Sequence, residues 1–337
     1  MRQATKRYRA AIVGCGRIGA LFERERAHDK PASHAGAVRA NDATELVALV
    51  DTNPKTLAAA RKLFPGAAGY RSLADCLKQR RPDIVIIATP PAARLSLLKA
   101  CVRARVPMVV CEKPLAMSAN EAKRTEALAA TNGLTFVLNY QRRFSPLFAR
   151  VRARIKSGKL GRIQQVTCYY SNGLYNNGGH VVDALAYLLD DHIVSAAASR
   201  NATNTTHPVG DVNVDALLTT KGGTTVVLQS FDQKEYGIHD IRLYGTKGSV
   251  VLTDYGTTLV ETPARPSRFA GIRQLDRTRH RTTRMPLSAT KDALAHVIEC
   301  YERRRKPVSS VGSGLLTLRV LDAVARSAKR EGRTVAV

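Results

Sequence analysis

The sequence predicts an α/β Rossmann domain, a doubly wound parallel sheet, followed by an α+β domain with a large, mostly antiparallel, open-faced sheet. Three observations lead to this fold. The first third alternates helices with uniformly apolar strands, which indicates strands buried on both faces. A glycine-rich turn follows the first strand. Beyond residue 163, strands joined by short glycine-containing turns dominate, as in an antiparallel sheet.

The first domain is expected to span residues 1–117. Asn53 and Pro54 give one helix a cap followed by proline, and Thr89-Pro90-Pro91 stops an apolar strand. We expect strands at 8–14, 46–50, 83–88 and 106–111, and helices from about Arg17 and at 54–64, 72–79 and 92–104. This alternation of strands and helices is the pattern of a doubly wound sheet.

The second domain is expected to span residues 118–337. Turns at 221–223 and 245–248 each contain glycine and predict two hairpins. We expect strands at 135–139, 163–171, 212–219, 224–231, 241–244, 249–252 and 257–260, and helices at 118–132, 146–157, 291–303 and 315–330. The two C-terminal helices are candidates to pack back on the first domain.

Composition narrows the class of protein. The 337 residues are 44% hydrophobic, which excludes collagen-like and wholly disordered chains. No apolar run approaches the roughly 18–20 residues of a membrane helix. The N-terminus has no separate apolar stretch of the kind found in signal peptides, so we expect no signal peptide. The six cysteines are scattered without a C-x-x-C pair, which indicates free thiols without a metal site. We therefore expect a cytoplasmic protein without a membrane partner.

The net charge is +26, from 53 Lys and Arg against 27 Asp and Glu, and it is spread through both halves. It indicates either attraction of polyanions, such as nucleic acid or a phosphorylated substrate, or a generally arginine-rich surface. Seven arginines lie within residues 265–284, which we expect to form a basic loop. Aromatic residues make up only 5%, and no nucleic-acid-binding motif accompanies the arginines. Nucleic acid is therefore not the expected partner.

The glycine-rich turn is a G-x-G-x-x-G motif that follows a predicted strand and opens a predicted helix. Such a turn lets backbone N–H groups approach a dinucleotide pyrophosphate at a helix N-terminus. The residues predicted to bind the cofactor here are Gly14, Gly16, Arg17, Ile18 and Gly19.

Asp51 ends the second strand, where an acidic residue binds the ribose 2′-hydroxyl and favours NAD. NADP stays possible, because Thr52, Asn53 and Lys55 can meet a phosphate.

Asp51 lies 32 residues after Gly19 rather than the usual gap of about 20. The excess predicts an insertion around residues 23–40, and two roles stay open for it, a cover over the active site or a plain surface loop. It contains His28, Pro31, Ser33 and His34.

Further motifs follow in order, beginning with Cys111–Pro114, a strand that ends in Glu-Lys-Pro. The others are Ala88-Thr89-Pro90, Asn139–Phe144 with its R-R-F, the G-x-L-G turn Gly158–Gly161, and Gly179–Asp183 with its H-x-x-D. Together they resemble the glucose-fructose oxidoreductase / inositol dehydrogenase / rhizopine catabolism (Gfo/Idh/MocA) family of NAD(P)-dependent oxidoreductases. The resemblance runs from about residue 8 to 190.

The resemblance implies a Rossmann domain coupled to an open-faced α+β domain, with the active site in the cleft between them. It places Lys113 beside the nicotinamide ribose and the reacting hydroxyl, where an ammonium stabilises developing negative charge, and it implies a cis bond to Pro114. Thr89, Pro90 and Glu112 join the cofactor site. His180 matches the acid/base of the family, a role that suits imidazole near neutral pH.

One position departs from the family pattern. The family commonly places Asp four residues before the catalytic histidine, and this chain has Asn176 there. An amide can orient His180 but cannot stabilise imidazolium as a carboxylate does, so His180 should be a weaker base. Asp183 is expected to cap or brace its helix. Candidate substrate residues are Tyr140, Arg143, Tyr175 and Asn176, with packing or hinge roles equally open for the first three.

The expected function is hydride transfer between nicotinamide and a ring hydroxyl or keto carbon of a sugar, cyclitol or nucleotide-linked sugar. The resemblance also implies a homodimer or homotetramer. Two alternatives stay open. One is a non-catalytic NAD(P)- or sugar-sensing regulator on the same scaffold, favoured by the missing Asp and the charge. The other is a keto-sugar reductase that uses NADPH.

Overall fold

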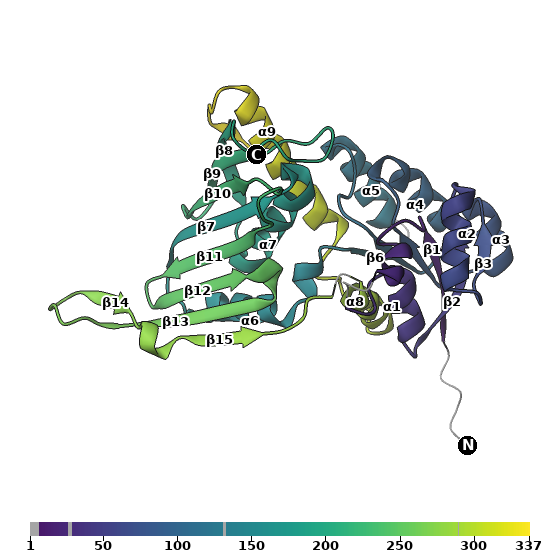
Figure 1. Ribbon diagram of the computed structural model, residues 1–337, viewed down its shortest axis with the longest axis horizontal. Coiled ribbons are helices and arrows are strands. Elements are labelled where there is room, and N and C mark those ends of the chain that lie inside the picture. Colours follow the sequence, from purple (N-terminus) through teal and green to yellow (C-terminus); the bar gives the residue numbers. More distant parts are fainter. Residues whose placement is uncertain (1–6, 26–28, 131–132, 289) are drawn as a thin grey trace, which may run out of the picture. The chain divides into compact units, whose positions relative to one another are not determined.

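The computed structural model describes residues 7–25, 29–130, 133–288 and 290–337. His28 of the expected insertion and the expected helix end at Asn132 lie outside these residues. By packing, the chain divides into two compact units, Met1–Phe144 with Ser288–Leu315, and Ser145–Leu287 with Leu316–Val337. Each unit is described by itself (Figure 1).

The first unit is built on a six-stranded parallel sheet of order β3-β2-β1-β4-β5-β6. This confirms the predicted doubly wound sheet. The strands are β1 (Tyr8–Val13), β2 (Thr44–Val50), β3 (Ala68–Tyr70), β4 (Ile84–Ile87), β5 (Met108–Cys111) and β6 (Thr135–Leu138). The helices are α1 (His34–Ala40), α2 (Pro54–Leu63), α3 (Leu73–Arg80), α4 (Arg94–Arg103), α5 (Ala119–Ala130) and α8 (Lys291–Glu302).

The strands are apolar throughout because helices cover both faces of the sheet. All four residues of β4 are fully buried. The expected cap forms at Asn53, whose side chain accepts N–H groups at the start of α2, and Ser72 caps α3 in the same way. The sequence predicts a boundary between the two domains at 117/118. By packing, β6 and α8 belong with the first sheet, because β6 pairs with β5 and α8 packs on both strands.

The predicted helix from about Arg17 is wrong as a continuous element. After the glycine turn the chain forms only a short 3₁₀ helix, η1 (Leu21–Arg24), and α1 begins at His34. The expected insertion around 23–40 is accordingly too long at its C-terminal end, because His34–Ala40 is helix. Ser33 caps that helix by accepting the N–H of Gly36.

The second unit is built on a large sheet of order β14-β13-β12-β11-β7-β10-β9-β8-β16, with β15 paired to β13. Its pairs are antiparallel except for β10 with β7. The strands are β7 (Ile163–Ser171), β8 (Ile193–Arg200), β9 (Val214–Thr220), β10 (Thr225–Phe231), β11 (His239–Gly245), β12 (Gly248–Thr253), β13 (Thr258–Pro266), β14 (Arg273–Leu275), β15 (Arg281–Arg284) and β16 (Val335–Ala336).

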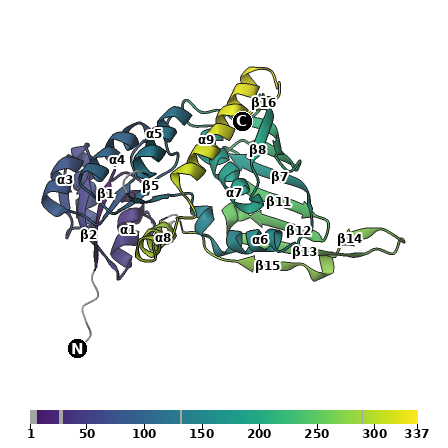
Figure 2. The same ribbon diagram turned by 180° about the vertical axis from the view of Figure 1, so that it is seen from behind.

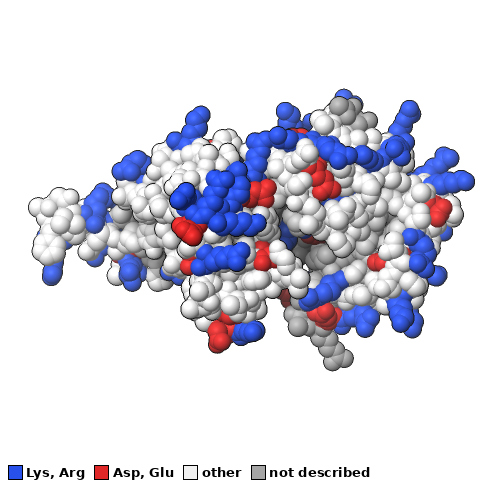
Figure 3. Space-filling view, turned by 90° about the horizontal axis from the view of Figure 1, so that it is seen from above, with Lys and Arg blue, Asp and Glu red and all other residues white. Residues whose placement is uncertain are grey.

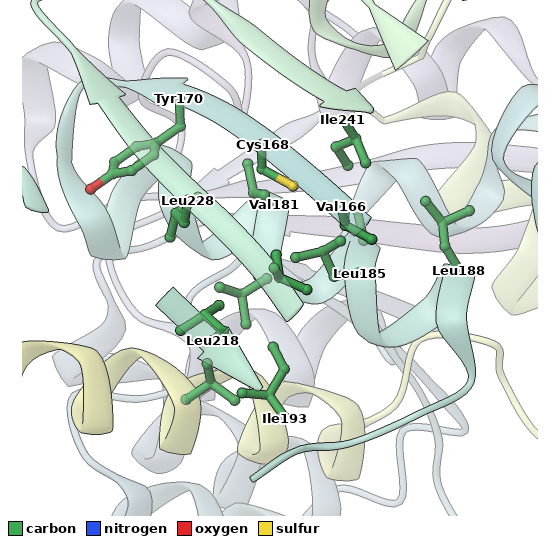
Figure 4. Close-up of a cluster of buried hydrophobic side chains, with 14 of the residues drawn as sticks. Val166, Cys168, Tyr170, Val181, Leu185, Leu188, Ile193, Leu218, Leu228 and Ile241 are labelled. Atoms are coloured by element: carbon green, nitrogen blue, oxygen red, sulfur yellow. The ribbon is translucent and has the colours of Figure 1, made fainter. Parts of the chain in front are cut away.

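Three helices cover one face of this sheet. They are α6 (Pro146–Lys156), α7 (Gly179–Leu189) and α9 (Val311–Lys329), whose residues from Leu316 belong to this unit. The core between sheet and helices includes Val166, Tyr170 and Leu185 (Figure 4). Buried and exposed residues alternate along β9, and Leu217 on the uncovered face is 49% exposed. The predicted open-faced sheet is therefore confirmed.

The arginine segment 265–284 differs from the basic loop that we expected. It contains β14 and β15, both paired with β13, and the β13–β14 hairpin projects from the edge of the sheet (Figures 1 and 2). Asp276, which is 5% exposed, forms ion pairs with Arg265 and Arg279 there. Elsewhere basic side chains are spread over much of the face shown in Figure 3.

No helix in the described part of the chain is long and apolar enough to cross a membrane.

Tyr170 gives a test of the second core. Its buried hydroxyl donates to the carbonyl of Val214 (2.8 Å) and accepts the N–H of the same residue (3.0 Å). Tyr170→Phe removes both of these buried hydrogen bonds, so we expect a loss of about 1–3 kcal/mol in unfolding free energy. The control Tyr244→Phe alters a residue that is 37% exposed and should change stability by less than about 0.5 kcal/mol. Urea denaturation of both variants checks this, and equal stabilities would contradict it.

Candidate active site

The predicted cofactor and lysine residues of the first unit share one edge of its sheet. Val13, Ile87, Cys111 and Leu138 lie side by side as the last residues of β1, β4, β5 and β6. The parallel ladder continues one step further, because Ala88, Glu112 and Asn139 each donate an N–H to the neighbouring strand, at 2.7, 2.9 and 2.7 Å. Ligands of doubly wound sheets bind outside this carboxyl edge.

The three motif glycines have distinct surroundings. Gly14 has φ +90°, and a Cβ on it would lie 2.7 Å from the carbonyl oxygen of Ala88. A Cβ on Gly19 would lie 1.9 Å from the carbonyl oxygen of Gly14, whereas a Cβ on Gly16 would meet nothing within 4 Å. Gly14 and Gly19 thus make the turn tight, and Gly16 leaves its outer side open. An open backbone at the second glycine is what a pyrophosphate requires, so the turn fits a dinucleotide.

Asp51 is joined to this turn by hydrogen bonds. Its carboxylate accepts the N–H of Cys15 and the N–H of Asn53, both at 2.8 Å and each on a different oxygen. Each oxygen keeps acceptor capacity for ribose hydroxyls. Cys15 is no candidate nucleophile, because burial, with the charge of Asp51, raises the pKa of its thiol to about 12. Thr89 has a buried hydroxyl oxygen without a partner in the described part of the chain, which also fits a ligand at this edge.

Arg17 and Ile18 contact the segment that follows the turn. The guanidinium of Arg17 lies 4.7 Å from the ring centre of Phe22. The carbonyl of Ile18 accepts the N–H of His34 at 2.9 Å.

The turn that carries Lys113 is held through its backbone by Arg94. Arg94 donates from Nη1 to the carbonyls of Glu112 and Pro114, the residues on either side of Lys113, and the Lys113–Pro114 bond is cis. It also donates to the carbonyl of Thr89 from Nε (3.0 Å) and Nη2 (2.6 Å). One buried guanidinium therefore joins the turns that follow β4 and β5.

Arg94 is not among the residues predicted from the sequence. Its signal was a cation in the first turn of a helix, where the helix dipole disfavours positive charge, so that a partner elsewhere was to be expected.

The side chain of Glu112 is held as firmly as its backbone. Oε1 lies 2.8 Å from Nε2 of His34 and accepts from Nδ2 of Asn139 at 2.6 Å. Burial acts to raise the pKa of Glu112, but the hydrogen bonds and charge of these neighbours outweigh it, so the pKa is lowered and the carboxylate is ionised. The charge of Lys113 acts in the same direction. His34, Glu112 and Asn139 thus form a buried cluster next to the lysine.

In the second unit, a π-helical turn, η4 (Gly173–Gly178), leads directly into α7. His180 lies in the first turn of α7. Asn176 lies in the π turn, and its side-chain amide donates to the carbonyl of Asn172 (3.1 Å). Single π turns recur at functional sites in proteins. The structure thereby brings Asn176 and Tyr175 into the turn that precedes His180.

Asp211 holds this π turn in place, and the sequence offered no signal for it because it lies far along the chain. Its carboxylate accepts the N–H groups of Tyr175 and Asn176, both at 3.0 Å. Gly173, with φ +94°, allows this approach, because a Cβ there would lie 2.2 Å from Oδ2 of Asp211.

The remaining candidate residues have structural contacts. Tyr140 is only 3% exposed. Arg143 donates to the carbonyl of Val308 at 3.1 Å. The hydroxyl of Tyr175 donates to Asp322 at 2.9 Å, and burial together with that carboxylate raises its pKa. Asp183 braces α7 against α9, because it accepts from Thr317 at 3.3 Å.

Comparisons with known proteins agree with these two units. Residues 8–140 match a family described as an oxidoreductase family with an NAD-binding Rossmann fold, and residues 171–251 match the GFO/IDH/MocA C-terminal domain. D-apiose dehydrogenase from Paraburkholderia graminis is 26% identical, over 98% of this chain and 90% of the relative. Inositol 2-dehydrogenase from Rhizobium meliloti is 26% identical, over 95% of this chain and 96% of the relative.

Solved structures agree in fold. The WlbA dehydrogenase from Bordetella pertussis, in complex with NADH and UDP-GlcNAcA, superposes with a TM-score of 0.76 at 24% identity, covering 98% of this chain and 99% of the other. Aldose-aldose oxidoreductase from Caulobacter crescentus superposes with a TM-score of 0.77 at 20% identity, covering 98% of this chain and 100% of the other. The glycine turn, the Glu-Lys-Pro turn and both matched domains make this chain a member of the Gfo/Idh/MocA family of NAD-binding oxidoreductases.

Proposed function

We propose that the chain is an NAD-dependent dehydrogenase that oxidises a ring hydroxyl, or reduces the matching ketone, of a sugar, cyclitol or nucleotide-linked sugar. The observation that carries this proposal is the fixed position of Lys113. Arg94 holds the backbone on both sides of it, at the same sheet edge as the glycine turn. The names of relatives support the substrate class, since they include D-apiose dehydrogenase and inositol 2-dehydrogenase.

The cofactor end of the site favours NAD. Asp51 presents a carboxylate tied to the glycine turn, which accepts bonds from two ribose hydroxyls and repels a 2′-phosphate. When bound, nicotinamide supplies the hydride acceptor, or the donor in the reverse direction.

The chain's own groups handle the charge and the proton. The ammonium of Lys113 binds the substrate oxygen and stabilises the negative charge that develops on it. His180 accepts the hydroxyl proton during oxidation and returns it during reduction. Glu112, ionised beside Lys113, places a negative charge next to the ammonium group.

Asn176 sets the strength of the base. It precedes His180 by one helical turn, a spacing at which side chains on one helix face approach each other. An amide orients the imidazole without adding negative charge, so we expect His180 to be a weaker base than it would be with an aspartate at position 176.

The activity itself is tested with NAD and a panel of sugars, cyclitols and UDP- and dTDP-linked sugars, by the absorbance of the reduced cofactor. Lys113→Ala should lower kcat/KM by about 10²–10³-fold because charge stabilisation is lost, and His180→Ala by about 10²–10⁴-fold because proton transfer is lost. The control is Lys78→Ala, which alters an exposed lysine on α3. Binding of NAD and a sugar without turnover would instead identify a sensor.

Asp51→Ala should weaken NAD binding by about tenfold or more, because hydrogen bonds to a charged group are each worth roughly 1.5–3 kcal/mol. Binding of NADP should change less, so the preference for NAD should fall. Isothermal titration with both cofactors measures this, with the exposed Asp42→Ala as control. Unchanged NAD affinity in Asp51→Ala would rule out the assigned role of Asp51.

Asn176→Asp should strengthen His180 as a base. A nearby carboxylate favours imidazolium and raises the pKa of the histidine, so the acidic limb of the kcat/KM profile for oxidation should move to higher pH. The measurement is the pH profile of both proteins on the same substrate. A shift of that limb to lower pH would contradict the assignment.

A further inference from the structure

The hydrogen bonds at the start of α1 reveal where extra chain enters the first unit. His34 donates its N–H to the carbonyl of Ile18, and Ala35 donates to Gly19, both at 2.9 Å. Each bond joins residues sixteen positions apart, whereas a continuous α-helix joins residues four apart. The difference is twelve residues. The bonds that join α1 to the turn after the glycine motif therefore have the spacing of a helix once twelve residues, the inserted loop of residues 22–33, are left out of the count.

The described residues of the inserted loop are bonded to one another at its base. Glu23 accepts the N–H of Ala32 (3.1 Å) and the hydroxyl of Ser33 (2.8 Å). Ser33 in turn accepts the N–H of Gly36 at 3.0 Å, as the cap of α1. Lys30 donates to the backbone carbonyls of Phe22, Glu23 and Glu25. These bonds close the loop and keep α1 in register.

The first residue after the loop is His34, which is fully buried and whose Nε2 lies 2.8 Å from the carboxylate of Glu112. Since Glu112 is ionised and can only accept, His34 presents an N–H to it. Glu112 immediately precedes Lys113. The path from the inserted loop to the reactive lysine is thus Glu23, Ser33, His34 and Glu112, with each step a hydrogen bond or a peptide neighbour.

We propose that His34 is a positioning residue for Lys113, and that the Glu23–Ser33 clamp keeps His34 in place across the inserted loop. This inference rests on the proposed function, in which Lys113 binds the substrate oxygen. His34 fixes the side chain of Glu112, and Arg94 fixes its carbonyl. Together they restrict the backbone of the neighbouring Lys113 to one conformation. The inserted loop itself is then dispensable for positioning, whereas a broken clamp on an intact loop is harmful.

The test compares kcat, KM for NAD, and hydrogen–deuterium exchange in peptides covering residues 108–116. His34→Ala should lower kcat by about 10- to 100-fold, as expected when a reacting group is displaced by about an ångström, with little change in KM for NAD and faster exchange in those peptides. His34→Gln, which keeps an N–H donor, should restore most of kcat. The control His296→Ala removes a half-buried histidine of the same unit, which accepts the N–H of Val308, and should leave exchange at 108–116 unchanged.

Two further variants separate the clamp from the loop. Deletion of residues 22–33 joins Leu21 to His34 and makes the helix continuous, so kcat and exchange should stay close to the wild type. Glu23→Ala keeps the loop but breaks its base, so it should resemble a mild His34→Ala. Equal behaviour of these two variants would overturn the role of the clamp.

Wild-type kcat and wild-type exchange in His34→Ala would overturn the positioning role. If that variant does not fold, Glu23→Ala takes its place, with the same signature in a milder form. If the wild-type chain turns over no compound of the panel, the proposed function fails, and the exchange data still decide whether His34 orders the turn.

Discussion

The register of the parallel sheet is the constraint on which the rest of the first unit depends. Because β1, β4, β5 and β6 end side by side, the pairing of the strands alone places the residues that follow them at one edge of the sheet. The glycine turn, Thr89, Glu112 with Lys113, and Asn139 all use this position. Arg94 and the Glu112 cluster then add the finer order, by joining turns that the ladder has already brought together.

The sheet of the second unit differs from that of the first because helices cover only one of its faces. Its strands supply a firm platform for α7, and Tyr170 and Val166 lie in the core beneath that helix. The approach to His180 is then shaped by a π turn that Asp211 holds from a distant loop. The irregular π turn η4 thus sets the position at which α7 and its His180 begin, while α7 itself is a regular helix.

Much of this could be predicted from the sequence, for local reasons. Apolar strands, the cap at Asn53 and glycine-containing hairpin turns act within a few residues, and their elements were found near their true bounds. β8 was missed because its alanines and serines have low strand propensity and take their strand from pairing with β9 and β16. Arg94, the His34–Glu112 bond and Asp211 were missed because each joins residues that only the tertiary fold brings together.

The interrupted helix has a consequence for how such a chain can be altered. His34 and Ala35, which follow the inserted loop, bond to Ile18 and Gly19, which precede it. The junction after Leu21 therefore accepts extra sequence at little cost to the sheet behind it. The surrounding fold requires that the two ends of the insert return to neighbouring positions, as the bonds of Glu23 to Ala32 and Ser33 ensure in this chain. This junction is therefore a natural graft point, where a foreign peptide, a binding loop or a spectroscopic tag can be installed close to the glycine turn while the sheet behind it is left intact.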